Sequence, residues 1–351
     1  MRCAKQIPAI AFIGSWLPAL LLLPIDHCVA QSAHPSSPTS IFAPASTPAK
    51  SIFNLSLFVV TTTAVIFLVV AGLLTYTIVK YRRRTGDDGR EPAQVYGSNQ
   101  VELAWTIIPI LIVIVLFMAT ARVIADIQRD TPKNAIHVTV IGHQFWWEYR
   151  YPGSNVVTAN ELHVPVGVPT ELKLLSADTD HSFWVPRLAG KTDLIPGHPN
   201  SMWIDPQKPG LYLGQCAQYC GTQHAKMLLR VYAQPRADFD LWMQQQSQPA
   251  EAALARPDNG AASEGHRVFE ATACVNCHTV GSTSAHGRFG PDLTHLMSRD
   301  TIGSGIAANT HDNLRSWVQD PSRFKPGCLM PSMGLTDHDV DALTAYLETL
   351  R

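Results

Sequence analysis

The chain has 351 residues, of which 46% are hydrophobic and 16% charged, and its formal net charge is −1. At about 100–200 residues per domain, this length predicts two or three domains. The composition argues against a disordered chain, and 25 prolines without a regular repeat exclude a collagen. A net charge near zero gives no footprint for a nucleic acid, so we expect no nucleic-acid partner. Seven cysteines are too few for a disulfide scaffold, but four of them stand in two close pairs.

Residues 1–30 have the layout of a secretory signal peptide. Two basic residues precede an uncharged run, and small residues around Ala30 suit cleavage. A retained membrane anchor is the alternative, which Pro18 and Pro24 disfavour because proline interrupts a helix. Residues 31–50, rich in Ser, Pro, Thr and Ala, are expected to form a flexible spacer.

Two long uncharged runs follow, and each is long enough to cross the hydrocarbon core of a bilayer. Residues 51–79 and 103–121 contain no Asp, Glu, Lys or Arg, and a spanning helix needs about 20 apolar residues. Buried helices of a soluble protein are the alternative, but a polar loop separates the two runs. The pattern predicts a transmembrane hairpin over residues 51–130, with helices at about 54–79 and 103–124.

The loop between the two runs sets the expected orientation of the hairpin. Its basic residues are Lys80, Arg82, Arg83, Arg84 and Arg90. The positive-inside rule places such a loop in the cytoplasm, so both termini and everything after about residue 130 are expected on the outer side. Glu102 stands at the cytoplasmic start of the second run. An acid at this position either extends to the membrane surface or serves a proton path.

Residues 131–235 have the pattern of an all-β domain. Apolar Ile136, Val138 and Val140 recur at every second position. Further strand-like runs are Phe145–Tyr151, Glu161–Val164, Thr170–Leu175, Ser201–Ile204, Leu211–Gln215 and Met227–Tyr232. Pro-Gly pairs separate several of them. Short strands at this spacing predict a β-sandwich or barrel of about 100 residues.

One loop of this domain concentrates metal-binding side chains. Cys216, Cys220, His224 and Met227 supply two thiolates, an imidazole and a thioether, a soft ligand set that suits copper. Two cysteines can bridge two copper ions, and each ion then needs its own imidazole. The second histidine must come from elsewhere, and His181, between two predicted strands, is the best candidate. A disulfide and a zinc site are the alternatives, and neither accounts for the methionine.

The loop Cys-x-x-x-Cys-Gly-x-x-His-x-x-Met resembles the binuclear CuA loop of cytochrome c oxidase subunit II. Further segments match in the family's order, namely Glu102-Leu-Ala-Trp-Thr, Gly142-His-Gln-Phe-Trp-Trp-Glu-Tyr, His181-Ser-Phe-Trp-Val-Pro and Lys191-Thr-Asp-Leu-Ile-Pro-Gly. The resemblance implies a cupredoxin fold. It also implies a set of CuA ligands, which are His181, Cys216, Cys220, His224, Met227 and the backbone carbonyl of Gln218. It further implies that Glu102 lies at the entrance of a proton path into subunit I.

Two positions depart from the family pattern. Many members have Glu in place of Gln218 and use its side chain to bind Mg²⁺ shared with subunit I, so a magnesium site is left open here. The family's electron-entry Trp aligns with Phe145, and Trp146 and Trp147 follow it. We take Phe145 and Trp146 as candidates for electron entry. A buried aromatic ridge is the alternative for these three residues.

After the β domain, residues 236–260 are expected to hold a short amphipathic helix (236–247) and a linker (249–260). A flexible linker of 12 residues spans about 17–21 Å. This keeps the following module close to the β domain at an effective concentration on the order of millimolar. Docking of that module should therefore depend little on long-range charge.

Residues 261–351 contain the c-type haem attachment motif. In Cys274-Val-Asn-Cys277-His278, the two thiols would anchor the vinyl groups of the haem and the imidazole would become the proximal iron ligand. A thioredoxin-like dithiol is the alternative, but it needs a βαβ context that the sequence lacks.

The sixth iron ligand is expected further along the chain. Met330 is followed by proline, as in class I cytochromes c, with Met333 as competitor and Met297 third. Methionine ligation would raise the haem potential. Pro291 lies in a Gly-Pro-Asp-Leu segment that resembles the loop whose carbonyl holds the proximal histidine. A Thr-x-x-Asp capping box opens a C-terminal helix at 337–350.

Together these features predict a multi-domain chain: a two-helix transmembrane hairpin, an all-β cupredoxin-like sandwich and a small all-α cytochrome c domain. The chain is identified as a subunit II of a proton-pumping cytochrome c oxidase with one covalent haem c and a binuclear CuA, in the bacterial plasma membrane. The expected partners are subunit I, subunit III, membrane lipid and an electron donor such as cytochrome c or the quinol–cytochrome c reductase.

Three alternatives belong to other classes. A quinol oxidase subunit II would lack the copper ligands, and a nitrous oxide reductase would need a large second catalytic domain. A membrane-tethered electron carrier without an oxidase gives no reason for Glu102.

Overall fold

The computed structural model describes residues 39–83, 91, 94, 96–129, 131–132, 134–249, 260–281 and 283–351. The predicted signal peptide, the first part of the spacer, much of the basic loop and most of the linker lie outside the described residues.

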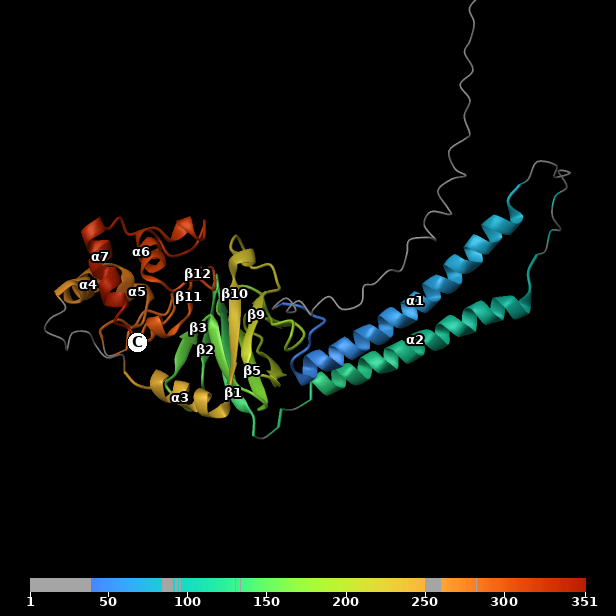
Figure 1. Ribbon diagram of the computed structural model, residues 1–351, viewed down its shortest axis with the longest axis horizontal. Helices are drawn as coiled ribbons and strands as arrows, with labels where there is room; N and C mark the ends of the chain where they lie inside the picture. Colours follow the sequence, from blue (N-terminus) through green and yellow to red (C-terminus); the bar gives the residue numbers. More distant parts are fainter. Residues whose placement is uncertain are drawn as a thin grey trace, which may run out of the picture. The chain divides into compact units, whose positions relative to one another are not determined.

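Two long helices, α1 (Thr47–Tyr81) and α2 (Asn99–Ile127), run side by side at the start of the described chain (Figure 1). Each is long and apolar enough to cross a membrane. Both are longer than predicted, and α1 begins inside the expected spacer. Their apolar side chains are largely exposed along both helices. Exposed apolar surface of this extent indicates contact with lipid or with other membrane helices.

The middle of the chain is a sandwich of two five-stranded sheets. The first sheet has the order β3 (Val157–Ala159), β2 (Trp146–Arg150), β1 (Ile136–His143), β5 (Thr170–Ser176) and β8 (Asn200–Ile204). The second has the order β4 (Glu161–Pro165), β10 (Leu228–Gln234), β9 (Gly210–Cys216), β6 (His181–Trp184) and β7 (Thr192–Leu194). Strands β1 and β5 pair in parallel, as do β4 and β10, and the other pairs are antiparallel. The core lies between the sheets, where Trp147, Leu172 and Phe183 are fully buried.

The predicted strand runs match observed strands with ends shifted by a residue or two. Three short strands, β3, β6 and β7, were not predicted, because three or four residues are too few to show a period of two. One of them corrects an expectation about His181, which begins β6 instead of lying between strands.

Both long helices are fastened to the sandwich at one end. The backbone N–H of Thr47 donates to Asp205 Oδ1 at 2.7 Å, and Trp203 Nε1 donates to the carbonyl of Ile127 at 3.0 Å. Asp205 follows β8 and Trp203 lies in it, so both helix ends are held at the same strand.

Helix α3 (Arg236–Gln246) follows the sandwich and packs against it through Phe239 and Trp242. The Trp242 ring meets Tyr151 edge-on, with centroids 5.4 Å apart. This agrees with the predicted amphipathic helix, whose apolar side now has a partner.

The C-terminal part is mainly helical, with its own hydrophobic core. Its elements are α4 (Gly260–Ala271), α5 (Cys274–Cys277), η3 (Leu296–Ser298), β11 (Thr301–Ile302), β12 (Ala307–Ala308), α6 (His311–Gln319), η4 (Pro321–Arg323) and α7 (Asp337–Leu347). The predicted capping box is present between Thr336 and Asp339 at the start of α7. Helices α4 and α7 cross so closely that a Cβ at Gly265 would stand 1.9 Å from the carbonyl oxygen of Ala342. Only glycine fits at this crossing.

Candidate functional site

The cysteine loop begins at the last residue of β9 and returns at the start of β10. Cys216 pairs with Phe183 of β6, and its backbone N–H donates to the carbonyl of Met227 at 2.9 Å, which closes the loop at its base. Between these ends, η1 (His224–Lys226) turns the chain back toward the sandwich. The loop is therefore held at both ends by sheet hydrogen bonds.

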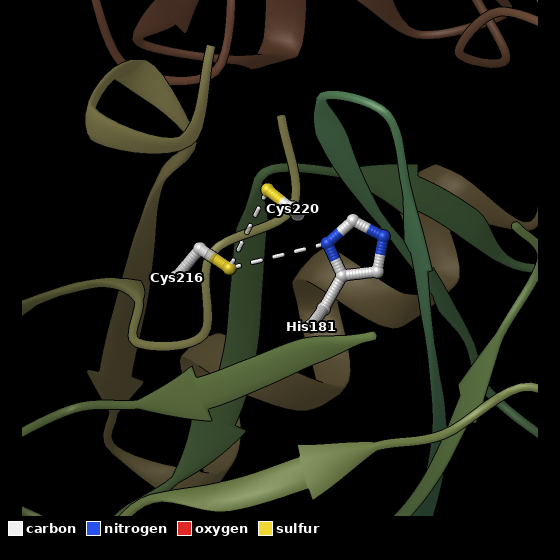
Figure 2. Close-up of side chains that lie close together, drawn as sticks. All are labelled: His181, Cys216 and Cys220. Carbon is white, nitrogen blue, oxygen red and sulfur yellow. Dashed lines mark hydrogen bonds between the residues drawn. The ribbon is translucent and has the colours of Figure 1, made fainter. Parts of the chain in front are cut away.

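The side chains of His181, Cys216 and Cys220 point toward one another (Figure 2). The two cysteine sulfurs lie 3.9 Å apart, and both thiols are free. His181 Nδ1 lies 3.9 Å from Cys216 Sγ, and His224 Nδ1 lies 3.8 Å from Cys220 Sγ. Ligands at metal distances of about 2.0–2.3 Å in a tetrahedron stand about 3.3–3.8 Å apart, and two sulfurs stand at the upper end of this range. The observed separations fit metal ligands and are too long for a disulfide, which is about 2.05 Å.

Two further donors complete the set. Met227 Sδ lies 3.9 Å from Cys220 Sγ, and the carbonyl oxygen of Gln218 lies 3.1 Å from Cys216 Sγ. Two sulfurs are thus surrounded by two imidazoles, a thioether and a carbonyl. This donor set fits soft, copper-type coordination and exceeds what a four-ligand zinc site needs.

His181 is oriented by a carboxylate on its other side. Its ring is fully buried, and Nε2 donates to Asp178 Oδ1 at 2.8 Å, so Nδ1 faces the cysteines. Burial alone would lower the pKa of His181, but the hydrogen bond to Asp178 and the contact with Cys216 outweigh it and raise that pKa. A partner of this kind fixes the tautomer of a metal-binding histidine.

The free thiols share their protons unequally. The hydrogen bond from Cys220 holds the pKa of Cys216 well below its usual range, and the same contact raises the pKa of Cys220. A thiolate is the form that binds a metal, so the lowered pKa of Cys216 favours metal binding at this residue.

Close packing also limits the space around His181. A Cβ at Gly142 would stand 2.8 Å from His181 Cδ2, so strand β1 reaches the imidazole only because this residue is glycine. Trp147 meets the same ring edge-on, with centroids 6.0 Å apart. Trp147 is fully buried, and both Trp147 and Phe145 belong to the hydrophobic core of the sandwich.

A second site surrounds the Cys-x-x-Cys-His motif, where a cavity of about 210 Å³ is lined mostly by apolar side chains. Cys274, Cys277 and His278 all line it. His278 Nδ1 lies 2.7 Å from the carbonyl oxygen of Pro291, the contact expected from the Gly-Pro-Asp-Leu segment. Burial lowers the pKa of His278 and so favours the neutral imidazole that binds a metal, with Nε2 left for an iron. A Cβ at Gly290 would stand 2.5 Å from this ring.

The methionine candidates separate into two groups. Met330 and Met333 both line the cavity, whereas Met297 packs against the hydrophobic core of the C-terminal part. The donor set around the cavity, two thiols, an imidazole and two thioethers, fits a covalently held haem.

The wall of this cavity includes residues of the sandwich. Gln144, Phe145, Trp146 and Asn160 line it together with the residues of the C-terminal part. Phe145 and Trp146 are each only 8% exposed. Gln144 Nε2 donates to the carbonyl of Cys220 at 2.6 Å, so one residue that lines the cavity is hydrogen-bonded directly to the cysteine loop.

Two predicted side chains lie outside these two sites. Glu102 is exposed in the first turn of α2. The side chain of Gln218 is exposed on the cysteine loop, although its carbonyl belongs to the donor set.

Three residues with a structural role were not predicted from the sequence. Asp178 had a weak signal, since it stands three residues before His181. Lys325 and Glu161 had none, because their hydrogen-bond partners, Phe145 and Thr301, lie 180 and 140 residues away along the chain.

Three family models match the chain. They are described as cytochrome c oxidase subunit II, transmembrane domain (residues 35–122), cytochrome c oxidase subunit II, periplasmic domain (residues 154–233), and cytochrome c (residues 262–351). Among solved structures, the periplasmic domain of subunit II of cytochrome oxidase from Bradyrhizobium japonicum is 28% identical. It covers 33% of this chain and 96% of that chain, with a TM-score of 0.32.

Curated relatives match over most of the chain. "Cytochrome c oxidase subunit 2" of Alkalihalophilus pseudofirmus is 36% identical over 294 residues, 82% of this chain and 84% of the relative. The protein of the same name from Bacillus sp. strain PS3 is 33% identical over 77% of this chain and 80% of the relative. "Quinol oxidase subunit 2" of Bacillus cereus is 28% identical over 68% of this chain and 81% of the relative. The predicted arrangement of a helical hairpin, a cupredoxin-like sandwich and a cytochrome c domain is confirmed, and the chain belongs to the cytochrome c oxidase subunit II family, a membrane-anchored component of an oxidoreductase complex.

Proposed function

We propose that this chain is the electron-entry subunit of a proton-pumping cytochrome c oxidase. It would accept electrons through one covalently attached haem c and pass them to a binuclear CuA centre and on to the O₂-reducing site of subunit I. The haem and the copper centre supply the reversible one-electron redox chemistry. The chain's own residues bind these groups, orient them and exclude water from them.

The observation that carries this proposal is the continuity between the two sites. The wall of the cavity beside the haem attachment motif contains Gln144 and Phe145, and Gln144 is bonded to the carbonyl of Cys220. A ring carbon of Phe145 also lies close to Gly221 of the same loop, about 3.0 Å from where a Cβ would stand. A donor group in the cavity and an acceptor group in the loop would thus be separated by few side chains. Phe145 and Trp146 are the proposed residues of electron entry.

The proposed copper centre uses the convergent set already described. Its ligands are His181, Cys216, Cys220, His224, Met227 and the carbonyl of Gln218. Two sulfurs with one imidazole beside each of them favour two bridged ions over one. The proposed iron ligands are His278 and Met330, with Cys274 and Cys277 as the covalent anchors. A magnesium ion at Gln218 is not part of the proposal, because this side chain carries no charge.

The proposed orientation follows from the basic loop between α1 and α2. It places that loop in the cytoplasm and both redox modules on the periplasmic or outer side. Glu102 then lies at the cytoplasmic end of α2, exposed on this chain, where subunit I would cover it and take protons from it. Subunit III and an external donor complete the proposed partners.

Purification of the chain from its native membrane tests the proposal. We expect co-isolation with a large polytopic subunit containing high-spin haem, O₂ consumption with a reduced donor, and proton release on the outer side. A haem stain of the denatured chain should remain positive, because the haem is covalent. Isolation of the chain without any haem-containing membrane subunit would instead support a tethered electron carrier.

A further inference from the structure

Two buried charged side chains, one from the haem module and one from the sandwich, each form hydrogen bonds with the backbone of the other part. We define the CuA module as residues 134–246 and the haem module as residues 260–351. Lys325 of the haem module is 4% exposed, and its Nζ donates to the carbonyl of Phe145 at 3.0 Å. Glu161 of the CuA module is 1% exposed, and its carboxylate accepts from Thr301 and Asp300 of the haem module.

Two further hydrogen bonds next to Lys325 join the copper loop to the segment Phe324–Pro326 of the haem module. Lys226 Nζ donates to the carbonyl of Phe324 at 2.8 Å, and Gln223 Nε2 donates to the carbonyl of Pro326. Lys226 and Gln223 both belong to the copper loop. Lys325, which stands between the two acceptors, also lines the haem cavity. One short segment therefore contacts the copper loop and leads, a few residues later, to Met330.

The second contact lies at the β11–β12 hairpin. Glu161 Oε1 accepts from the backbone N–H of Thr301 at 2.8 Å and from its hydroxyl at 2.6 Å, and Oε2 accepts from the N–H of Asp300 at 3.0 Å. Ser304 extends this contact, since its hydroxyl donates to the carbonyl of Leu228 at 2.8 Å. Tyr232 adds a hydrogen bond to Asp300 Oδ2 at 2.7 Å.

The charges of this interface specify its geometry more than they strengthen it. A buried charge destabilises a structure unless it is hydrogen-bonded. Both charges would be solvated again if the two modules separated. Any other docking position that buries the same surfaces would leave the ammonium of Lys325 or the carboxylate of Glu161 without its partner. The two contacts therefore penalise alternative positions and select one.

We propose that Lys325 and Glu161 are positioning residues that hold the haem module in one docked position on the CuA module. The inference rests on the proposed function and adds that no search by a mobile module precedes electron transfer. In this step one electron would pass from a reduced haem c held by the haem module to copper held by the CuA module, and no other reactant would be needed. A module in a fixed position transfers this electron at a rate independent of solvent viscosity and of salt, whereas a module that swings on its linker slows as viscosity rises.

The test is a kinetic measurement on the purified oxidase complex. A photoreductant injects an electron into haem c, and oxidation of the haem is followed while sucrose raises the viscosity. For the native chain we expect a rate constant that does not change with viscosity or ionic strength. Lys325→Met should lower the rate constant about tenfold, because alternative docked positions are no longer penalised once the buried ammonium is removed. Its rate should also become dependent on viscosity.

Two further variants control this experiment. Lys173→Met removes an exposed lysine from β5 and should behave as the native chain. Glu161→Gln keeps an amide oxygen for Thr301 but turns a donor toward the N–H of Asp300, so it should show the viscosity dependence even if Lys325→Met fails to incorporate haem. The copper EPR signal should be unchanged in each folded variant, and the haem spectrum should be unchanged in Glu161→Gln and Lys173→Met, whose residues do not line the haem cavity.

The outcomes separate this inference from the proposed function. A viscosity-dependent rate in the native chain would overturn the fixed position, and so would native rates in both Lys325→Met and Glu161→Gln. A native complex that transfers no electron from haem c to copper would contradict the proposed function itself.

Discussion

Asp178 offers the sharpest test of how the copper site is built, because it contacts the site without being a predicted ligand. Its Oδ1 accepts from His181 Nε2 at 2.8 Å, and its Oδ2 accepts from the backbone N–H of Gln144 at 2.6 Å. Asp178→Asn keeps the size of the side chain but removes its charge. One of the two atoms that now accept would become a donor.

The expected loss can be estimated from these contacts. Carboxylates that hold a metal-binding histidine typically contribute about 10–100-fold to metal affinity, which corresponds to about 1.4–2.7 kcal/mol. Asp178 is hydrogen-bonded by three groups in all, and these bonds outweigh burial and hold its pKa below the usual range. It is therefore ionised at neutral pH and acts on His181 with its full charge. We therefore expect Asp178→Asn to lower the affinity of the site for copper by about 10–100-fold.

The assay is competition for copper against a chelator of known affinity, with the EPR signal of the copper centre recorded in parallel. Asp193→Asn is a matched control. Asp193 lies on β7, which pairs with the strand of His181, and its side chain is partly exposed and forms only a long ion pair with Lys191 at 4.0 Å. Unchanged copper affinity and an unchanged EPR signal in Asp178→Asn would refute the role of this carboxylate in orienting His181.

Four further predictions concern single residues. Cys216→Ser should abolish the mixed-valence EPR signal expected when a thiolate bridges two copper ions. An EPR spectrum of the variant that equals that of the native chain would contradict a binuclear copper centre. Met330→Ala should eliminate the weak methionine-to-iron absorption band of oxidised haem c and lower the haem potential, whereas Met333→Ala should leave both nearly intact. The reverse result would assign the sixth iron ligand to Met333. Glu102→Ala should slow steady-state O₂ reduction without slowing electron transfer from haem c to copper. Unchanged turnover would contradict a role of Glu102 in proton uptake. Burial lowers the pKa of His163 to about 4, so its protonation favours the unfolded state and chemical unfolding should show stability falling as pH drops from about 6.5 to 4. His163→Phe should flatten this dependence, and an equally steep fall in the variant would assign it to other groups.

Local patterns in the sequence accounted for the hairpin, the longer strands, the capped C-terminal helix and the two cysteine motifs. Each of these depends on residues within one turn, one strand or one loop. The copper loop is a clear case, since Cys216, Cys220, His224 and Met227 come together through a single reversal of the chain. His181 was found by chemistry and resemblance, although its strand was too short to be recognised.

The contacts between the modules could not be predicted in the same way. Lys325 and Phe145 are 180 residues apart, and the hydrogen bond between them ends on a backbone carbonyl, which leaves no trace in the side-chain pattern. Glu161 likewise meets backbone N–H groups of the haem module. The short linker predicts that the haem module stays near the sandwich, but the composition of the chain cannot show which surfaces of the two modules meet.

The central claim is that one chain holds both a covalent haem c and two copper ions, and cofactor analysis of residues 131–351, produced as a separate soluble fragment in a host that attaches haem c, tests it most directly. Elemental analysis together with the absorption spectrum of the denatured fragment gives the copper and covalent haem content per chain. The account predicts two copper ions and one haem that remains attached after denaturation. One copper ion or none, or a haem released by denaturation, would contradict it.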